Sequence, residues 1–402
     1  MKFYYKEDIF KLVKGRSIVL FGSGNIAQKT KSLISNNVKF IADNTKNLWG
    51  TTYKNIKIQN PNKLKKNSKK YFIIICTTSF EEVSSQLKNF GYENEQDFIL
   101  SPILNDLRII EEFSDLNKDL IFSSGSPPNK DKDYGGGIYH IKLRNNNWSC
   151  TKKISGNCHG LIKYKNNFVA VDTDLGIFEF DDNFKILRSQ KLPSFSRAHG
   201  VSYSNKENEF YVVCTYLDAI LVLNEKFKIK HKIQISNKVG SLNTASHHCN
   251  DCEYNEGYLY VSMFSETGNW KKDVFDGCIL EIDLKRKKIN KPIKTGLWMP
   301  HNPKIINGSF YVNDSLRGNL LGNNFNIVGS FPAFTRGLHY DGRFFYIGQS
   351  RNRNYSKNIG LTNNISIDAG IIVFDEQTKV SRFLQVSPKI SEIHSIVDLN
   401  LD

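Results

Sequence analysis

Four histidines occupy the same position in a repeated sequence pattern, and they are the residues of this chain best suited to chemistry. In its clearest form the pattern is a His-Gly-aliphatic step that opens a strand, as in C-H-G-L-I and A-H-G-V-S. Looser copies are P-H-N-P-K and I-H-S-I-V, so the four histidines are His159, His199, His301 and His394. Neutral imidazoles that converge from several strands are typical ligands of zinc, iron and copper. The repeat therefore indicates a metal-binding or catalytic site.

Two further copies of the repeat match by position rather than by identity. H-C-N-D-C places Asn250 at the histidine position, with His248 two residues earlier on the same side of the strand. T-R-G-L-H places Arg336 there, and His339 follows three residues later, so its side chain should face the other way. The candidate catalytic residues are His159, His199, His301, His394 and Arg336. The candidate metal ligands are His159, His199, His248, His301 and His394.

Arginine is scarce in this chain, and several arginines fall close to the repeated position. Arg336 and Arg197 weigh against a metal site made of histidines alone, because a cation repels a metal ion, and they suit an anionic ligand such as a carboxylate, phosphate or sulfate. The candidate substrate-binding residues are Arg197, Asn250, Arg317, Arg351 and Arg353. We favour an anion site with a divalent transition metal beside it. A metal site without an anion, and histidines that only pack between repeats, stay open.

Two other motifs give weaker signals. H-H-C-N-D-C (His247 to Cys252) resembles a zinc motif, but no second C-x-x-C exists, and a strand would send its two cysteines to opposite faces. Acidic residues that could act as acid or base follow the expected second strands, but aspartate at such positions usually stabilises a turn. These residues are Asp172, Asp174, Asp218 and Asp314.

The repeats themselves indicate a β-propeller. They lie roughly 40 to 50 residues apart, the period of blades made of four-stranded sheets. Asp119 to Ser124 and Gly137 to Leu143 are predicted as second and third strands with no first strand before them. H-S-I-V-D-L, from His394 to Leu399, is a first strand with nothing after it. Joined, the two ends complete one blade, so we predict a propeller over residues 119–402 that is closed by the C-terminal strand, with six blades favoured over five or seven.

The longest insertions indicate which end of the propeller is functional. Residues 125–134, 264–275 and 350–368 each join a second strand to a third strand. Such loops leave the propeller on the face where the first strands begin, which is also the face of the repeated histidines. We therefore predict the site at this mouth of the central channel.

The N-terminal region carries the pattern of a nucleotide-binding βαβ unit. The apolar run S-I-V-L-F is followed by G-S-G-N-I-A, which contains Gly22, Gly24 and Ala27. A second apolar run ends at Asp43, nineteen residues beyond Gly24, where an acid can bind ribose hydroxyls. A third buried strand ends at Thr77, at the sheet edge where ligands of such folds bind. These five residues are the candidate cofactor-binding residues.

The predicted fold class is thus an α/β Rossmann-like N-terminal domain followed by an all-β propeller. We place the first domain at residues 1–104 and a helical connector at residues 105–118. The alternative for the first domain is a structural module with an empty crevice.

Two resemblances add to these predictions. The stretch I-A-D-N-T-K-N-L-W-G-T-T-Y-K-N-I-K-I-Q-N-P-N-K-L resembles a small Rossmann-like module attached to bacterial sugar-modifying enzymes, over residues 15–104. That resemblance implies a nucleotide or nucleotide sugar as cofactor, with NAD as a less favoured alternative. M-P-H-N-P-K-I-I-N-G, P-A-F-T-R-G-L-H and H-C-N resemble an uncharacterised bacterial family of propeller-like proteins, over residues 157–399. This second resemblance implies that a family pattern includes His301, Arg336, Arg351, His248 and Asn250. It does not imply an activity.

The composition of the chain predicts which classes of partner the protein lacks. The net charge of +15 comes mostly from lysines that are spread along the chain beside many asparagines, so we predict no nucleic-acid partner. No window reaches the length of about 18 apolar residues that a membrane span needs, and no signal peptide is visible. The seven cysteines lack the spacing of a disulfide framework, which is typical of a cytoplasmic protein.

These observations lead to two functional hypotheses. In the first, the protein is an enzyme of bacterial surface-glycan metabolism, a metal-assisted lyase or hydrolase or a sugar-modifying enzyme, that acts on a sugar, nucleotide sugar or other small anion at the propeller mouth. In the second, it is a non-catalytic propeller scaffold or binding protein in glycan assembly. The sequence fixes neither the substrate nor the oligomeric state.

Overall fold

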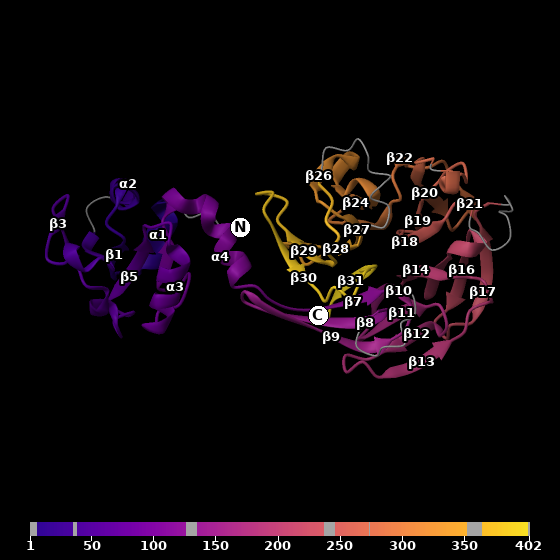
Figure 1. Ribbon diagram of the computed structural model, residues 1–402, viewed down its shortest axis with the longest axis horizontal. Helices are drawn as coiled ribbons and strands as arrows, with labels where there is room; N and C mark the ends of the chain where they lie inside the picture. Colours follow the sequence, from indigo (N-terminus) through magenta and orange to yellow (C-terminus); the bar gives the residue numbers. More distant parts are fainter. Residues whose placement is uncertain are drawn as a thin grey trace. The chain divides into compact units, whose positions relative to one another are not determined.

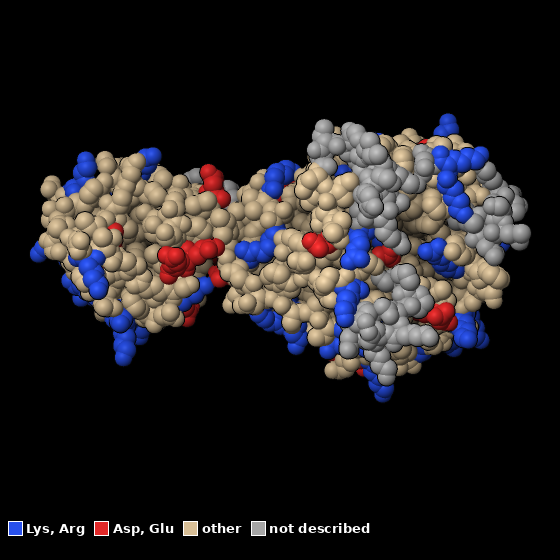
Figure 2. All heavy atoms as spheres, viewed as in Figure 1, with Lys and Arg blue, Asp and Glu red and all other residues tan. Residues whose placement is uncertain are grey.

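The computed structural model describes residues 6–34, 38–125, 135–236, 246–272, 274–351 and 364–400. The chain divides into two compact units, Met1–Asp115 and Leu116–Asp402 (Figure 1). No helix of the described ranges is long and apolar enough to cross a membrane. On the face shown in Figure 2, lysine and arginine side chains are scattered among other residues.

The described part of the first unit is built on one six-stranded sheet. Its strands are β1 (Ser17–Phe21), β2 (Val38–Ala42), β3 (Thr52–Tyr53), β4 (Ile56–Gln59), β5 (Tyr71–Ile75) and β6 (Phe98–Leu100). They lie in the order β3-β4-β2-β1-β5-β6, and every neighbouring pair is parallel except β3 and β4. The central strands β1 and β5 are continuous apolar runs, as expected for strands covered on both faces.

Helices cover both faces of this sheet. They are α1 (Lys6–Val13), α2 (Asn25–Ile34), α3 (Phe80–Asn89) and α4 (Arg108–Ser114), with the short 3-10 helices η1 (Lys46–Leu48), η2 (Pro61–Leu64) and η3 (Pro102–Leu107). One apolar cluster joins Val19 and Ile73 of the strands to Leu87 of α3. A second cluster joins Ile18 of β1 to Ile34 of α2 and includes residues of α1. Successive residues of a strand therefore pack into the apolar clusters on opposite faces of the sheet, because side chains alternate between the two faces.

The prediction of a Rossmann-like fold is wrong, because the first unit is a mixed sheet with few helices. After β2 the chain turns through η1 into the antiparallel hairpin β3–β4, where an α-helical crossover was expected. Lys54 and Asn55 both have positive φ (49° and 65°), which is the geometry of a tight hairpin turn. The connection from β4 to β5, residues 60–70, contains the short 3-10 helix η2 and no α-helix.

The second unit is a β-propeller, and the predicted six blades are confirmed within its described residues (Figure 1). The first two sheets are β10 (Cys158–Tyr164), β11 (Asn167–Asp172), β12 (Gly176–Phe180) and β13 (Ile186–Gln190), then β14 (Ala198–Ser204), β15 (Glu209–Cys214), β16 (Ala219–Asn224) and β17 (Ile229–Gln234). The third holds β18 (Cys249–Asn255), β19 (Tyr258–Met263), β20 (Gly277–Asp283), β21 (Lys288–Ile289) and β22 (Lys294–Leu297).

Two more sheets follow the same order. They are β23 (His301–Ile306), β24 (Ser309–Asp314), β25 (Asn319–Leu321) and β26 (Ile327–Ser330), then β27 (Phe334–Tyr340), β28 (Phe345–Ser350), β29 (Gly370–Phe374) and β30 (Ser381–Gln385). Single-turn helices η4 (Thr215–Leu217), η5 (Trp270–Lys272), η6 (Ser315–Arg317) and η7 (Asn323–Phe325) lie in the connections.

The sixth blade closes the ring from both ends of the unit, as predicted. It consists of β31 (Ser395–Asp398), β7 (Asn117–Ser124), β8 (Gly137–Arg144) and β9 (Asn147–Ser155). β31 pairs antiparallel with β7, so that Ile396 lies opposite Phe122 (Figure 1). The last strand thereby covers a sheet edge that would otherwise be open.

The glycine of the His-Gly step is explained by the crowding of the inner strands. β10, β14, β18, β23, β27 and β31 pack side by side around the axis. A Cβ atom on Gly160 would lie 2.6 Å from the carbonyl oxygen of His199, and one on Gly200 would lie 2.5 Å from the Cα of Asp251. A side chain does not fit at these points of closest approach, and each histidine is placed just before such a point.

Candidate functional site

Three of the repeated histidines form a close cluster at the mouth of the propeller. His159 lies in β10, His199 in β14 and His394 directly before β31, and one ring nitrogen of each lies within 4.8 Å of the others. The ring centroids are 4.2 Å apart for His159 and His199, and 4.4 Å apart for His159 and His394. Nitrogens that bind one zinc ion at about 2.0–2.1 Å lie at most about 4.2 Å apart. Metal binding would therefore need side-chain shifts of about an ångström.

Two histidines of the cluster, His159 and His199, are held in the neutral form that metals require. Burial and the neighbouring imidazoles lower the pKa of His159 and of His199 well below the usual value. The Nδ1 atoms of both residues are buried and have no hydrogen-bond partner among the described residues. A buried nitrogen without a partner is costly, and a metal ion would satisfy both of these atoms.

The third histidine is oriented by a carboxylate that the sequence analysis missed. Glu392 is buried, and its Oε2 lies 3.0 Å from Nε2 of His394. A proton on Nε2 leaves the lone pair on Nδ1, and carboxylate partners of this kind orient metal-binding histidines. The signal was present as E-I-H, because residues two apart lie on the same side of an extended chain.

Glu392 also offsets the positive charge of Arg336, which would otherwise repel a metal ion. Its Oε1 lies 3.4 Å from Nη1 of Arg336, and both side chains are buried. The guanidinium group of Arg336 also lies over the ring of Phe334, at 4.7 Å from the centroid. Arg336 is thus paired with the Glu392 carboxylate within the site.

The other two predicted metal ligands lie outside the close cluster. His301 Nδ1 is 2.9 Å from the carbonyl oxygen of Met299 and 2.8 Å from Oγ of Ser315, contacts that fix its ring. His248 stacks on Phe264 with centroids 4.2 Å apart, and burial lowers its pKa to about 3. These two histidines form part of an aromatic wall beside the cluster.

The predicted substrate-binding residues occupy different places. Asn250 is buried, its Nδ2 donates to the carbonyl of Pro300, and its Oδ1 has no hydrogen-bond partner in the described structure. Arg197 donates to the hydroxyl of Tyr216, and its charge contributes to lowering the pKa of His199. Arg317 is paired with Asp314 at 3.0 Å and stacks on Trp298. Arg351 is exposed and donates to the carbonyl groups of Ile367 and Pro388, and Arg353 lies outside the described residues.

The aspartates at the ends of second strands hold loops in place. Asp172 accepts from the backbone N–H groups of Asn157, Asp174 and Leu175, and Asp174 itself is exposed. Asp218 accepts from the N–H groups of residues 246–248, and Asp314 accepts from Trp298 N and Arg317. The carboxylates of Asp172, Asp218 and Asp314 therefore accept hydrogen bonds that hold turns and loops in place.

The H-H-C-N-D-C motif does not form a close cluster of ligands. His247 Nδ1 is 2.9 Å from the carbonyl of Ser265, and Cys252 contacts the carbonyl of Tyr211. Cys249 lies against Asp218 instead. Over the described ranges, His159, His199 and His394 are the one group of three such side chains that gathers closely enough for a metal ion.

The candidate cofactor residues of the first unit meet at the turn after β1. Gly22 has a φ of 104°, and a Cβ atom there would lie 3.0 Å from the carbonyl of Cys76, so packing alone requires glycine. Asp43 accepts three hydrogen bonds, from the N–H and hydroxyl of Ser23 and from Thr45 N. Gly24 faces open space, Ala27 is buried in α2, and the hydroxyl of Thr77 accepts from Ser79 N.

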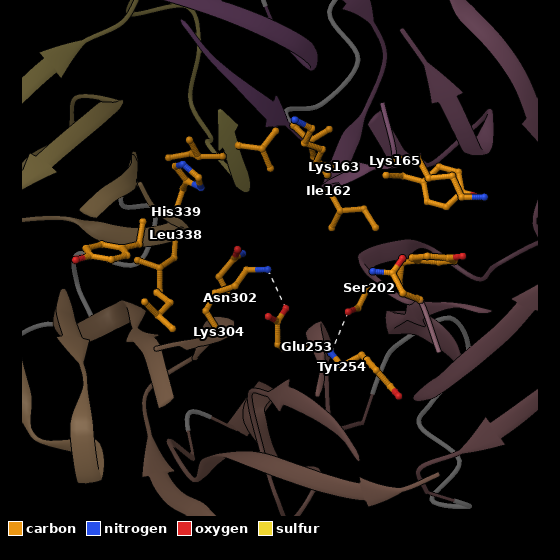
Figure 3. A pocket seen from close by; sticks show the side chains of 18 residues that line it. Ile162, Lys163, Lys165, Ser202, Glu253, Tyr254, Asn302, Lys304, Leu338 and His339 are labelled. Atoms are coloured by element: carbon orange, nitrogen blue, oxygen red, sulfur yellow. Dashed lines mark hydrogen bonds and ion pairs between the residues drawn. The ribbon is translucent and has the colours of Figure 1, made fainter. Parts of the chain in front are cut away.

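The opposite end of the central channel opens into a separate cavity of about 380 Å³ (Figure 3). Lys304 and Glu253 form an ion pair at 2.9 Å in its wall. His339, whose side chain was expected to face away from the repeated position, lines this cavity. The same inner strands thus carry the histidine cluster at one end and this polar cavity at the other.

Fold and site together define a six-bladed β-propeller with a buried cluster of three histidines at one mouth. Residues 179–400 match the family described as a domain of unknown function, DUF4915, over more than half of the chain. The protein belongs to this family. Residues 14–98 match the family described as C2185-like, N-terminal. Neither description names a sugar-modifying enzyme, so the resemblance of the first unit to such enzymes is not shown.

No curated protein matches the chain, whereas solved structures do. A nidogen/laminin complex matches with 12% identity and a TM-score of 0.48, covering 70% of this chain and 97% of that chain. A protein of unknown function from Bacteroides caccae matches with 13% identity and a TM-score of 0.48, covering 71% and 100%. A catalytically inactive virginiamycin B lyase from Staphylococcus aureus matches with 14% identity and a TM-score of 0.38, covering 56% and 79%. Similarity at this level says nothing about function.

Proposed function

We propose that the propeller binds a divalent transition metal ion on His159, His199 and His394 and presents it to a small anionic ligand. The observation that carries the proposal is the approach of three buried ring nitrogens to within 4.8 Å of one another, two of the rings having an Nδ1 without a hydrogen-bond partner among the described residues. Three imidazoles leave a coordination position open, which is typical of catalytic rather than structural metal sites.

The expected ligand is anionic because the surroundings are cationic or neutral. Arg336 is balanced by Glu392, and burial favours the neutral forms of His159 and His199, so a bound metal would add two positive charges to a buried site. Arg197 adds a further cation near the mouth. A carboxylate or phosphate would offset these charges. A sugar or nucleotide sugar is the narrower prediction, and it rests only on the resemblance of the first unit.

A metal in such a site can act as a Lewis acid on an oxygen of the ligand, which suits a lyase or hydrolase. The positive charge of Arg336 would then help to attract the anionic ligand, and the aromatic wall of His248, Phe264 and Trp270 would exclude water. Water exclusion strengthens each electrostatic contact in the site.

A second function, a non-catalytic binding protein, is favoured by one specific observation. Four buried carboxylates of the described residues near the mouth already have partners: Asp172, Asp218 and Asp314 hold loops, and Glu392 contacts His394 and Arg336. These four groups are therefore poorly placed to act as a general base. Both functions use the same metal site, but only the enzyme would convert its bound ligand into a product.

Metal analysis of three purified proteins tests the proposal. We expect the tag-free parent to bind about one equivalent of zinc, cobalt or manganese after dialysis against each ion, because three imidazoles make one site. The double change His159→Ala and His199→Ala should abolish binding. His301→Ala is the matched control, because it removes a histidine at the same repeat position but outside the cluster, and it should retain the metal. A parent that binds no metal, or a double variant that still binds it, would refute the proposal.

A further inference from the structure

A groove at the rim of the propeller lies beside the histidine cluster. It has a volume of about 570 Å³, and its walls are Asn157, Thr173, Asp174, Tyr216 and the loop from Lys191 to Arg197. The groove is built from the two blades that supply His159 and His199. Asn157 and Arg197 each lie two residues before one of these histidines in the chain, so the groove leads toward the cluster.

The groove holds a preorganised cation. Arg197 Nη1 lies 2.8 Å from the hydroxyl of Tyr216, and the guanidinium group lies 5.0 Å from the centre of the Tyr216 ring. Arg197 makes no ion pair with any carboxylate of the described residues. Two other arginines near the mouth differ in this respect, because Arg336 is paired with Glu392 and Arg317 with Asp314. A fixed guanidinium group without a counter-charge is suited to bind a planar carboxylate or a phosphate.

Two further features of the groove point to a ligand. Asn157 Oδ1 is buried and accepts no hydrogen bond from the described residues, while the backbone N–H of Asn157 is fixed by Asp172 at 2.6 Å. Phe195 is 68% exposed, the largest such fraction among the exposed apolar side chains of the described chain, and its φ is 61°. A left-handed backbone at a phenylalanine costs stability, and residues under such strain cluster at binding sites.

We infer that this groove is the substrate subsite of the proposed metal site and that it takes a ring compound bearing one anionic oxygen group. Arg197 binds the anionic group, Asn157 Oδ1 accepts from a hydroxyl or amine of the ligand, and Phe195 stacks on the face of the ring. The inference rests on the proposed function for its link to the metal, but the groove can be tested by itself. Both an aromatic acid and a sugar acid have this chemistry.

Binding of 4-hydroxybenzoate and of glucuronate, measured by calorimetry at low salt, tests the inference and separates the two sources. Glucose and benzyl alcohol are the uncharged counterparts and should bind at least about tenfold more weakly than the acids. Arg197→Ala should weaken binding of the acid by about tenfold or more, because it removes a charge-assisted pair of hydrogen bonds. Phe195→Asn should also weaken it, and asparagine tolerates the left-handed backbone, so the loop should keep its shape.

The matched control is Lys163→Ala, which also removes one cation but lines the cavity at the other end of the channel (Figure 3). We expect this variant to bind like the parent, and all variants to keep the metal content of the parent. Failure of both acids to bind the parent, or equal binding by parent and Arg197→Ala, would overturn the inference even with the metal present. Loss of binding in Arg197→Ala from a metal-free parent would instead keep the groove as a ligand site and overturn the proposed metal function alone.

Discussion

Glu392 is the residue on which the chemistry of the mouth depends. It contacts both His394 and Arg336, and it is buried with them. Repeated histidines could be recognised from the sequence because a repeat exposes their shared position. Glu392 could not be recognised in this way, because it occurs in one blade only and its meaning depends on Arg336 of the neighbouring blade. Contacts between blades are set by packing, which the repeat does not encode.

Removal of the charge of Glu392 tests this role. Glu392→Gln keeps the size of the side chain but leaves the buried Arg336 without its counter-charge. We expect a loss of about 3–5 kcal/mol in the free energy of unfolding, as is typical when one partner of a buried pair is removed. We also expect weaker metal retention, because His394 loses its orienting carboxylate. Denaturant unfolding and metal analysis measure the two effects, with Asp115→Asn at the exposed pair with Lys88 as control. Equal stability of Glu392→Gln and parent would contradict the account.

The buried neutral histidines also make stability depend on pH. Burial lowers the pKa of His159, His199 and His301, whereas the unfolded chain takes up protons near pH 6.5. Between these values the unfolded state binds more protons, so stability falls as the pH falls. Asp251, whose pKa burial raises to about 6, acts in the opposite direction.

We therefore expect the metal-free protein to be less stable at pH 5 than at pH 7.5. Each such histidine contributes up to about 1.4 kcal/mol per pH unit below its unfolded pKa. Melting temperatures across this range measure the effect, and the variant His159→Ala with His199→Ala should show a shallower dependence. A flat profile for the parent would mean that these rings are not held neutral.

At the scale of elements, the propeller was predictable and the first unit was not, for a physical reason. Three blades start at a crowded point that holds a glycine, Gly160, Gly200 or Gly337, and this constraint recurs in the sequence. The first unit has no such repeat. Its glycine turn matches the nucleotide-binding pattern, but Gly22 is required by its contact with Cys76 and Asp43 by its bonds to Ser23. The hairpin β3–β4 depends on the turn at Lys54 and Asn55, which the sequence analysis left unassigned.

The closing strand gives a prediction at this scale. Deletion of residues 394–402 removes β31 and exposes the edge of β7. We expect an insoluble protein or a melting temperature lower by about 10 °C or more, because several kcal/mol of pairing and packing are lost. Deletion of residues 400–402 alone keeps β31 and should change the melting temperature little. A truncated protein that melts within a degree or two of the parent would contradict the closure.

In the full-length protein, nucleotide binding at the first unit stays a prediction. Gly24 allows a clean test, because a Cβ atom there would meet no atom within 4 Å. We expect the parent to bind a UDP-, GDP- or CDP-sugar in preference to NAD(H), and Gly24→Val to lose this binding by blocking the approach of phosphate while both units stay folded. Calorimetry measures the affinity, and circular dichroism checks the fold. If the parent binds none of these compounds, the turn is a packing feature only.

We have proposed that three of the six inner strands, β10, β14 and β31, place the histidines of a metal site at one mouth of the propeller. Anomalous diffraction from crystals of the cobalt-loaded protein, recorded on both sides of the cobalt absorption edge, tests it most directly. The account predicts one strong peak, about 2.0–2.1 Å from a ring nitrogen of each of His159, His199 and His394. The absence of a peak between these rings, or a peak at His247 and Cys249 instead, would contradict it.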